Sequence, residues 1–413
     1  SGKYGRTAVC PDEGVRFSMH YLDNAATTRV LPEAAEAAVH AMLEEFGNPS
    51  SLHTTGQEAK RVLEDARETF AKYLHANPGE IYFTSGGSES DNQALRTAVA
   101  NGRKKGRNHV VTTAFEHHAI LHTLEALRKE WGTEYTLVPI PENGIIRVED
   151  VAAAIRDDTA LVTVMTANNE IGTIQPIHEI GELCLEKRVV FHTDAVQAGG
   201  ILDLDVARDH IDMLSLSAHK FHGPKGVGVL YVRRGNPVYT LINGGAQERG
   251  KRAGTENVPA IAGAAAAFRE ACENRAADTA KLTEMRDYLL DALAKIPHSI
   301  VNGDLTTRLP GNVHLCFEGI EGEGLLLLLD ANGIAASSGS ACTSGSLDPS
   351  HVLLALGRPH EIAHGSLRLS LSTENTMDDA RAIADIVPQV VDYLRGFSPV
   401  WHDLECGKAA HII

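Results

Sequence analysis

The segment Met213-Leu-Ser-Leu-Ser-Ala-His-Lys220 is the part of the chain from which the fold can be worked out. It begins as a short apolar strand, continues in small and polar residues, and ends on a lysine. The loop 221–226 follows, and its glycines and proline cannot continue the strand. Taken alone, a lysine at a strand end is usually a surface residue. It can instead hold an aldehyde cofactor as a Schiff base, where burial or nearby positive groups favour its neutral form.

Short apolar strands alternate with helical patterns on both sides of this segment. The strands are expected at 80–84, 110–113, 135–140, 160–165, 189–192, 213–216 and 227–232. Strands that are apolar throughout and are separated by helices indicate βαβ units, in which helices cover both faces of a parallel sheet. The predicted fold class is therefore α/β, with a large domain built on a mostly parallel sheet between helices.

The pattern changes after residue 256. An Ala-rich helical segment at 257–296 leads to strands at 312–317 and 366–371 with helices among them, which is typical of a smaller α+β domain. The sequence leaves open whether the helical segment 30–50 packs with this small domain. We expect four parts: an N-terminal arm or expression remnant at 1–18, the large domain at 19–256, a linking helix at 257–296, and the small C-terminal domain at 297–413.

The composition argues against several classes of function. The 413 residues carry a formal net charge of −16, whereas a nucleic acid or an anionic membrane as main partner requires a basic surface. No apolar run approaches the roughly 20 residues that span a bilayer. The six cysteines are scattered without a CxxC pair, which favours reduced thiols, a cytoplasmic setting and no metal site.

Two strand ends carry further polar groups. Ser85-Gly-Gly-Ser88 joins a strand to a helix, and a helix N-terminus that the backbone can approach closely is able to bind an anion, although many such turns are plain connections. Asp194 follows the apolar residues 189–191, at the sheet edge where ligands of α/β proteins bind. It is expected either to cap a helix or to pair with a cationic ring nitrogen.

Three more residues are candidates for chemistry. His117 could stack on a planar ring and act as an acid or base, although a capping or core histidine is the commoner case. Arg368 lies inside an apolar strand and needs an anion, which could be a ligand carboxylate or an internal salt-bridge partner. Cys342 lies in a run of small residues, 337–346, that cannot pack a core, so it is expected on an accessible loop.

Together these groups are what pyridoxal phosphate and an amino acid require. The sequence resembles the cysteine desulfurases of the NifS and IscS type, within the class-V aminotransferase superfamily of fold-type-I pyridoxal-phosphate enzymes. The resemblance extends over nearly all of 20–396, and its last block is similar to the longer-loop group of the family. The matching blocks are 21–28, 47–53, 84–90, 168–172, 219–226, 252–257 and 337–342.

The resemblance implies a role for each candidate at the cofactor. Lys220 would form the Schiff base and move the substrate Cα proton, and His117 would stack on the ring and take part in proton transfer. Asp194 would keep the ring nitrogen protonated. The remaining implied contacts are Gln197 to the ring oxygen, and Gly87, Ser88, Ser217, His219 and, across a homodimer, Thr255 of the partner subunit to the phosphate.

The resemblance also implies a reaction. Asn169 and Arg368 would hold the carboxylate of L-cysteine, and Cys342 would take its sulfur as a persulfide, leaving L-alanine. The sulfur would pass to an acceptor protein, either an iron–sulfur cluster scaffold or a tRNA-thiolation enzyme, with no direct nucleic-acid or membrane partner. Selenocysteine lyase and cystine lyase are alternatives on the same cofactor, and a non-catalytic scaffold is the alternative from another class.

Overall fold

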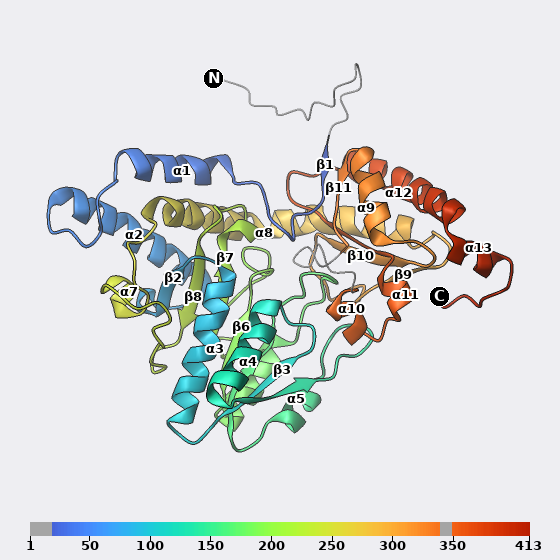
Figure 1. The fold of residues 1–413 in the computed structure, drawn as a ribbon. Helices are drawn as coiled ribbons and strands as arrows, with labels where there is room; N and C mark the ends of the chain where they lie inside the picture. The colour runs from blue at the N-terminus through green and yellow to red at the C-terminus, as the bar shows by residue number, and fades with distance from the viewer. Residues whose placement is uncertain (1–18, 339–348) are drawn as a thin grey trace.

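The computed structural model describes residues 19–338 and 349–413 (Figure 1). Its main sheet has seven strands in the order β2-β8-β7-β6-β5-β3-β4. Neighbouring strands are parallel except at β8, which is antiparallel to both β2 and β7. The α/β class with a mostly parallel sheet is therefore confirmed. The strands are β2 (Ile81–Thr84), β3 (His109–Thr113), β4 (Glu134–Val138), β5 (Thr159–Thr163), β6 (Val190–Asp194), β7 (Met213–Ser217) and β8 (Gly228–Val232).

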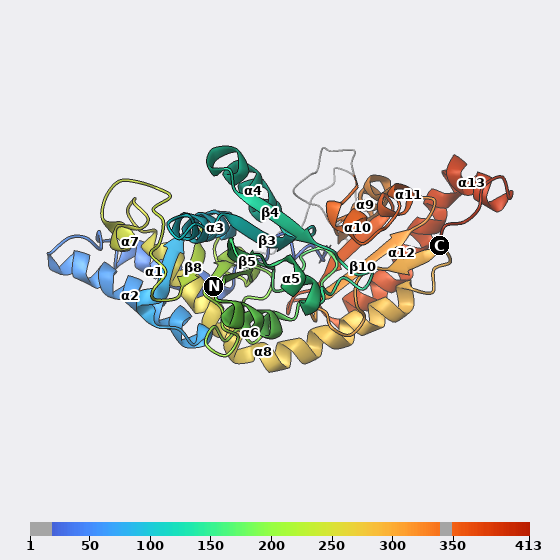
Figure 2. The same cartoon turned by 90° about the horizontal axis from the view of Figure 1, so that it is seen from below.

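Helices cover both faces of this sheet, because successive side chains of a strand point to opposite faces. Val110 and Met213 join a core with α3 (Gly87–Arg103) and α4 (His118–Trp131). Their neighbours Val111 and Leu214 join the opposite core. Figure 2 shows α3 and α4 on one side of the strands and α6 and α8 on the other. The helices of the opposite core include α2 (Thr54–Leu74), α6 (Ile177–Lys187) and the first half of α8 (Val258–Leu293).

The helix α8 connects the two halves of the molecule. Its residue Phe268 belongs to the core of the large sheet, and its residue Leu289 belongs to the core of the small sheet. Helix α1 (Pro32–Leu43) lies on the first half of α8, where a Cβ atom at Gly263 would come within 2.7 Å of the Ala34 carbonyl oxygen. Helix α1, the helical part of the segment 30–50, therefore lies against the large-sheet half of α8. Within the described residues, no helix has both the length and the apolar character needed to cross a bilayer.

The small sheet is antiparallel, in the order β12-β10-β9, and packs against α9 (Gly322–Ala331) and α12 (Met377–Phe397). The start of the chain also reaches this half: β1 (His20–Tyr21) pairs in parallel with β11 (Ile334–Ala335), and Asp23 bridges to Ser370. The loop after β1 therefore runs between the two sheets. The remaining elements here are β9 (Ser299–Val301), β10 (Asn312–Phe317), β12 (Ser366–Ser370), α10 (His351–Ala355), α11 (His360–Ala363) and α13 (Pro399–Glu405).

Candidate active site

A cavity of about 310 Å³ lies where β6 and β7 end, beside the first turn of α3. The loop after β1 and strand β12 of the small sheet complete its wall. This is the edge of a parallel sheet at which ligands of α/β proteins bind. The predicted residues that line the cavity are Gly87, Ser88, His117, Asn169, Asp194, Gln197, Ser217, His219, Lys220 and Arg368.

Lys220 is half-buried at the end of a short 3-10 turn, Ala218–Lys220, that follows β7 directly. Its Nζ donates hydrogen bonds to the carbonyl oxygens of Ala25 and Ala26, at 2.5 and 2.8 Å. The backbone N–H of Thr28 donates to the carbonyl of His219 at 3.0 Å, which ties the same loop to the turn. The amine is therefore held against the cavity wall by two segments that are far apart in the sequence.

Asp194 is the last residue of β6, which runs two residues further than the predicted strand 189–192. Its carboxylate accepts a hydrogen bond from the backbone N–H of Val196 at 2.9 Å. Burial raises the pKa of Asp194 to about 6, although the Val196 N–H and the charge of Lys220 act in the opposite direction. A cation placed beside this buried carboxylate would favour its ionised form.

A buried chain of polar groups lies behind Asp194, and the sequence reasoning did not single it out. The His192 ring makes hydrogen bonds with the hydroxyls of Thr163 and Ser215, at 2.8 and 3.0 Å. Asp91 lies 3.7 Å from this ring, and burial and the charge of Asp194 raise the pKa of Asp91 well above its usual value. Asp91 follows Ser88 by three residues on α3, so the helical period was a signal that could have found it.

His117 caps the N-terminus of α4, and its Nδ1 accepts a hydrogen bond from the backbone N–H of Ala119 at 3.1 Å. The proton of the neutral ring therefore lies on Nε2. Burial lowers the pKa of His117 to about 4, and the charge of Lys220 acts in the same direction. The imidazole at the cavity is consequently neutral at physiological pH.

Further histidines surround His117 at the cavity. The ring of His118 lies 4.8 Å from that of His122 and 4.5 Å from that of His351, measured between ring centroids. His118 and His351 line the cavity, and burial together with the neighbouring histidines lowers the pKa of His118 to about 4. Nε2 of His351 lies 3.0 Å from the backbone carbonyl oxygen of Glu116. Oε1 of Glu116 accepts hydrogen bonds from the Thr113 hydroxyl and the Met165 N–H, and burial raises its pKa to about 8.

The first turn of α3 forms the anion-binding end of the cavity. A Cβ atom at Gly87 would come within 2.7 Å of the Val196 side chain and 3.4 Å of Ser217, so only glycine allows the helix to begin this close to β7. Free N–H groups and the helix dipole favour an anion here. Glu89 of the same turn is paired with Arg252 at 2.9 Å, so its negative charge is compensated.

His219 and Gln197 contact the loop after β1. Nδ1 of His219 lies 3.2 Å from the hydroxyl of Thr27, and burial and the charge of Lys220 lower the pKa of His219 to about 4. The amide nitrogen of Gln197 donates to the carbonyl oxygen of Ala25 at 3.1 Å, the same oxygen that accepts from Lys220. The position of this loop therefore sets the position of several cavity residues.

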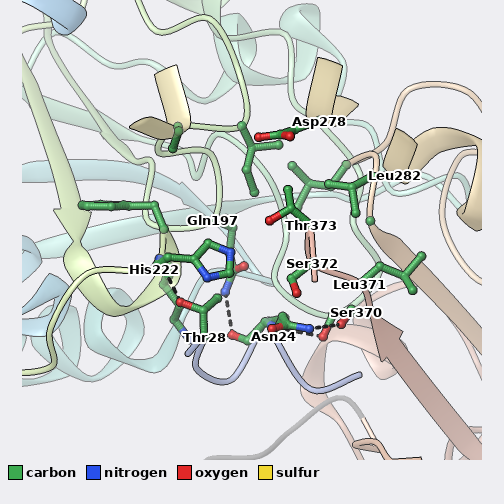
Figure 3. Close-up of a pocket in the computed structure, with 18 of the residues that line it drawn as sticks. Asn24, Thr28, Gln197, His222, Asp278, Leu282, Ser370, Leu371, Ser372 and Thr373 are labelled. Carbon is green, nitrogen blue, oxygen red and sulfur yellow. Dashed lines mark hydrogen bonds between the residues drawn. The ribbon is translucent and has the colours of Figure 1, made fainter. Parts of the chain in front are cut away.

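A second, smaller cavity of about 90 Å³ lies on the other side of Lys220 and Gln197, between α8 and the end of β12 (Figure 3). Figure 3 shows how the loop after β1 is fixed there. Asn24 donates to the carbonyl of Ser370, and the hydroxyl of Thr28 accepts from the His222 N–H, both at 2.8 Å. The loop is thus anchored to the small sheet and to the segment after Lys220.

Arg368 lies in the middle of β12 and is 1% exposed. Its guanidinium donates to the carboxylate of Asp23 at 2.9 Å and to the carbonyl of Asn169 at 3.0 Å. The internal salt bridge that the sequence left open is therefore present, while the same side chain lines the cavity. Glu170 also lines it and was not predicted. It accepts a hydrogen bond from the Ser350 hydroxyl, and burial raises its pKa.

Two predicted site residues are not placed at this cavity. Thr255 is exposed and lines a separate hollow with Ser85 and Arg252. The chain by itself therefore does not bring Thr255 to Lys220. Cys342 lies outside the described residues.

The residues at the cavity fit pyridoxal phosphate. A half-buried primary amine, a neutral imidazole and a helix N-terminus match an aldehyde, an aromatic ring and a phosphate. The buried carboxylate of Asp194 accepts only one described hydrogen bond, from a backbone N–H, and suits a protonated ring nitrogen.

Comparisons with known proteins agree with this fit. The family model described as aminotransferase class-V matches residues 20–383. The chain is 53% identical over 386 residues to a cysteine desulfurase IscS of Clostridium botulinum, which covers 93% of this chain and 97% of that protein. It is 51% identical over 380 residues to a cysteine desulfurase IscS of Methanosarcina thermophila, covering 92% and 94%. A solved structure named NifS-like protein superposes with a TM-score of 0.85 at 37% identity, covering 91% of this chain and 100% of that chain.

Proposed function

This chain belongs to the class-V aminotransferase family as a cysteine desulfurase of the IscS type, and we propose that it forms L-alanine from L-cysteine by passing the sulfur to Cys342. The observation that carries the proposal is the single cavity lined by Lys220, Asp194, His117 and Arg368. An amine, a buried carboxylate, a neutral imidazole and a guanidinium meet there, next to a helix N-terminus.

The cofactor would be pyridoxal phosphate, which supplies an electron sink for the substrate Cα when it is bound. Lys220 would attach it, and Asp194 would pair with its ring nitrogen. His117 would stack on its ring. The other residues that would hold it are Gln197 at the ring oxygen, and Gly87, Ser88, Ser217, His219 and, from a second copy of the chain, Thr255 at the phosphate.

Lys220 and His117 would take part in proton transfer. Once replaced by the substrate amine, Lys220 Nζ would accept the proton from the substrate Cα, because its side chain lines the same cavity. The His117 ring is neutral and carries its proton on Nε2, so that N–H can donate a hydrogen bond to the reacting group during proton transfer. Asp194 would remain ionised beside a cation, since such a partner lowers its raised pKa.

Substrate orientation would depend on Arg368 and Asn169. The guanidinium of Arg368 is already fixed by Asp23 and by the carbonyl of Asn169, so little rotamer freedom remains to be lost on binding a carboxylate. Its planar fork suits the α-carboxylate of an amino acid. The reacting atoms would thereby be presented to Lys220 in one orientation.

Cys342 would be the acceptor of the sulfur. Its thiolate would form an S–S bond with the substrate sulfur while the S–Cβ bond of the substrate breaks. The electron pair of that bond would stay with the carbon fragment, which takes up a proton and leaves as alanine. The enzyme would then carry a persulfide on Cys342 that can be passed to an acceptor.

Mass spectrometry after treatment of the holoenzyme with L-cysteine tests this assignment. The peptide that contains Cys342 should gain one sulfur atom, and alanine should form in step with it. Cys342→Ala should lose both signals while keeping the cofactor absorbance. Cys406→Ser is the matched control, because Cys406 is an exposed thiol at the C-terminal end of α13. Equal sulfur loading and alanine release in Cys342→Ala would contradict the proposal.

The functional unit would be a homodimer. Thr255 is exposed and lines a hollow of its own, and α1 with the segment after it exposes the apolar side chains of Met42, Leu43, Phe46 and Leu52. A patch of this kind marks an interaction surface. Light scattering of the purified holoenzyme should therefore give twice the chain mass.

The acceptor of the sulfur would be a protein of iron–sulfur cluster assembly or of tRNA thiolation. The described cysteines, Cys184, Cys272, Cys316 and Cys406, are free thiols, as is usual in the cytoplasm, where we place the enzyme. Transfer of labelled sulfur from the loaded enzyme to each class of purified acceptor would distinguish the two.

A further inference from the structure

Asp91 is a buried acid in the wall of the cofactor cavity, and the reaction proposed above does not use it. It lies on α3, close to one helical turn after Ser88, and its side chain lines the cavity although the residue is only 1% exposed. Its Oδ1 has no hydrogen-bond partner among the described residues. A buried carboxylate without a partner is costly, so this group needs either a cation or a proton.

The register of the sheet determines which groups Asp91 meets. His192 is paired with Met213 of the next strand, and Met213 belongs to the core that α3 covers (Figure 2). Asp194 follows His192 by two residues and therefore faces the same side of the sheet. Ser215 is paired with Asp194 and faces that side as well. The side chains that point from the sheet toward Asp91 are thus an imidazole, a carboxyl and a hydroxyl.

His192 does not supply a positive charge to Asp91. Its Nε2 lies 3.7 Å from Asp91 Oδ1, which is beyond hydrogen-bond distance, and the same nitrogen lies 3.0 Å from the Ser215 hydroxyl. Its Nδ1 lies 2.8 Å from the Thr163 hydroxyl. Burial lowers the pKa of His192 to about 3, so the ring is neutral between its two hydroxyl partners.

Asp194 is the better placed of the two carboxyls to carry a negative charge. It accepts a hydrogen bond from the Val196 N–H at 2.9 Å, and the charge of Lys220 favours its ionised form. For Asp91, burial and the charge of Asp194 raise the pKa well above its usual value, against a hydrogen bond from Ser215. Two negative charges at one buried site are unfavourable, so Asp194 ionises first and Asp91 keeps its proton.

The other titratable groups around the cavity do not reverse this order. Glu116 is fully buried, and burial raises its pKa to about 8, so it is mostly uncharged at neutral pH. Any charge on Glu116 would favour the proton on Asp91 further. Arg368 is already paired with Asp23. The remaining titratable groups that line the cavity are His117, His118, Glu170, His219, Lys220 and His351.

The two carboxyls complement each other once Asp91 is protonated. A neutral carboxyl has one O–H to donate, and Oδ1 of Asp91 is the oxygen without a partner. The carboxylate of Asp194 has about four acceptor positions, of which the Val196 N–H takes one and a ring nitrogen would take another. Asp194 therefore has room for the donor that Asp91 offers.

We propose that Asp91 is a positioning residue that stays uncharged and turns its O–H toward the carboxylate of Asp194. The inference rests on the proposed function, in which Asp194 pairs with the ring nitrogen of the cofactor. A donor beside Asp194 stabilises its ionised form, so the proton between the two stays on the ring nitrogen. A carboxylic acid kept neutral by burial can act as such a donor.

The pH dependence of cofactor affinity tests this role. Pyridoxal phosphate is titrated into cofactor-free wild type, Asp91→Ala and Asp91→Asn, and the midpoint of the loss of affinity at low pH is compared. The midpoint of wild type should lie near pH 6, where Asp194 takes up a proton. Asp91→Ala removes the donor and should raise the midpoint by about one pH unit or more, a change of about 10-fold in the proton affinity of Asp194. Asp91→Asn keeps the size and a donor N–H and should follow wild type.

Thr97→Ala is the control for a merely structural effect. Thr97 is a buried residue of α3 outside the cavity lining, and its hydroxyl accepts a hydrogen bond from the Tyr239 N–H at 3.0 Å. Its loss should lower the Tm without moving the midpoint. An unchanged midpoint in Asp91→Ala would overturn the inference, and so would a fall of the midpoint in both Asp91 variants, which would mean that Asp91 is charged. A wild type that binds no pyridoxal phosphate at any pH would overturn the proposed function as well.

Thermal unfolding of the cofactor-free chain gives a second test, which does not depend on the alanine variant. The pKa of Asp91 is raised in the folded chain, so the stability that its proton confers is present at low pH and is lost as pH rises. The Tm of wild type should therefore fall relative to that of Asp91→Asn between about pH 5 and pH 8, because asparagine does not ionise. A constant difference in Tm across this range would show that Asp91 ionises in the ordinary way and would overturn the inference.

Discussion

Replacing Glu116 with glutamine should change how the stability of the enzyme depends on pH. Glu116 is fully buried, and burial raises its pKa to about 8 from the usual 4.5. Between these two pH values the folded chain keeps the proton and the unfolded chain loses it. The stability that this proton confers is therefore complete below pH 4.5 and is lost as pH rises through 8.

The size of the effect follows from the shift. The difference between about 8 and 4.5 is some 3.5 units, and at about 1.36 kcal/mol per unit it amounts to roughly 5 kcal/mol. The unfolding entropy of 413 residues, at about 2.1 cal/mol/K each, is close to 0.9 kcal/mol/K, so the loss corresponds to about 6 °C in Tm. A glutamine cannot ionise, and its oxygen can still accept from Thr113 and Met165.

Thermal unfolding of the holoenzyme from pH 5.5 to pH 9 would measure this. The Tm of wild type should fall steadily relative to that of Glu116→Gln as pH rises from 5.5 to about 8, and the difference should level off above pH 8. Glu405→Gln removes the same charge from an exposed position and should follow wild type throughout. Parallel curves for wild type and Glu116→Gln across the whole range would refute the reasoning.

Three other substitutions have clear expected outcomes. Arg67→Met should lower the free energy of unfolding, measured by urea titration, by about 3–5 kcal/mol. The substitution leaves the buried carboxylate of Glu248, which Arg67 binds at 2.8 Å, without a positive partner. A loss below about 1 kcal/mol would contradict this. Gly87→Val should weaken pyridoxal phosphate binding to the apoenzyme at least about 10-fold by pushing the start of α3 away from Val196; unchanged affinity in equilibrium dialysis would show that the close approach is dispensable. Wild-type affinity for pyridoxal phosphate should fall below pH 6 as Asp194 takes up a proton, whereas Asp194→Asn should bind weakly at every pH. Identical pH profiles of the two proteins would show that Asp194 does not pair with the ring nitrogen.

Much of the site was predictable because its residues end strands. Lys220 and Asp194 follow apolar runs, and parallel strands bring their carboxyl ends to one edge, so the pattern alone predicts that they meet. The direction of β8 was not predictable in the same way, because an apolar run has the same composition in a parallel and an antiparallel strand. The antiparallel direction of β8 does not change which ends of β6 and β7 meet at the site.

The parts that sequence reasoning missed depend on contacts between distant segments. Asp91 and His192 look like ordinary helix and strand residues until the fold places them 3.7 Å apart. The salt bridge from Arg368 to Asp23 was left as an alternative, because nothing in either segment identifies the other. Thr255 remains a prediction, since a role at a subunit boundary cannot be tested within one chain.

The pairing of β1 with β11 determines when, during synthesis of the chain, the enzyme can bind its cofactor. β1 at residues 20–21 pairs with β11 at residues 334–335, so at about 5–20 residues per second β1 waits tens of seconds for its partner to be synthesised. The carbonyl oxygens of Ala25 and Ala26, which hold Lys220, follow that strand directly. Nascent chains should therefore be unable to retain the cofactor until β11 has been synthesised, so cofactor loading should come late.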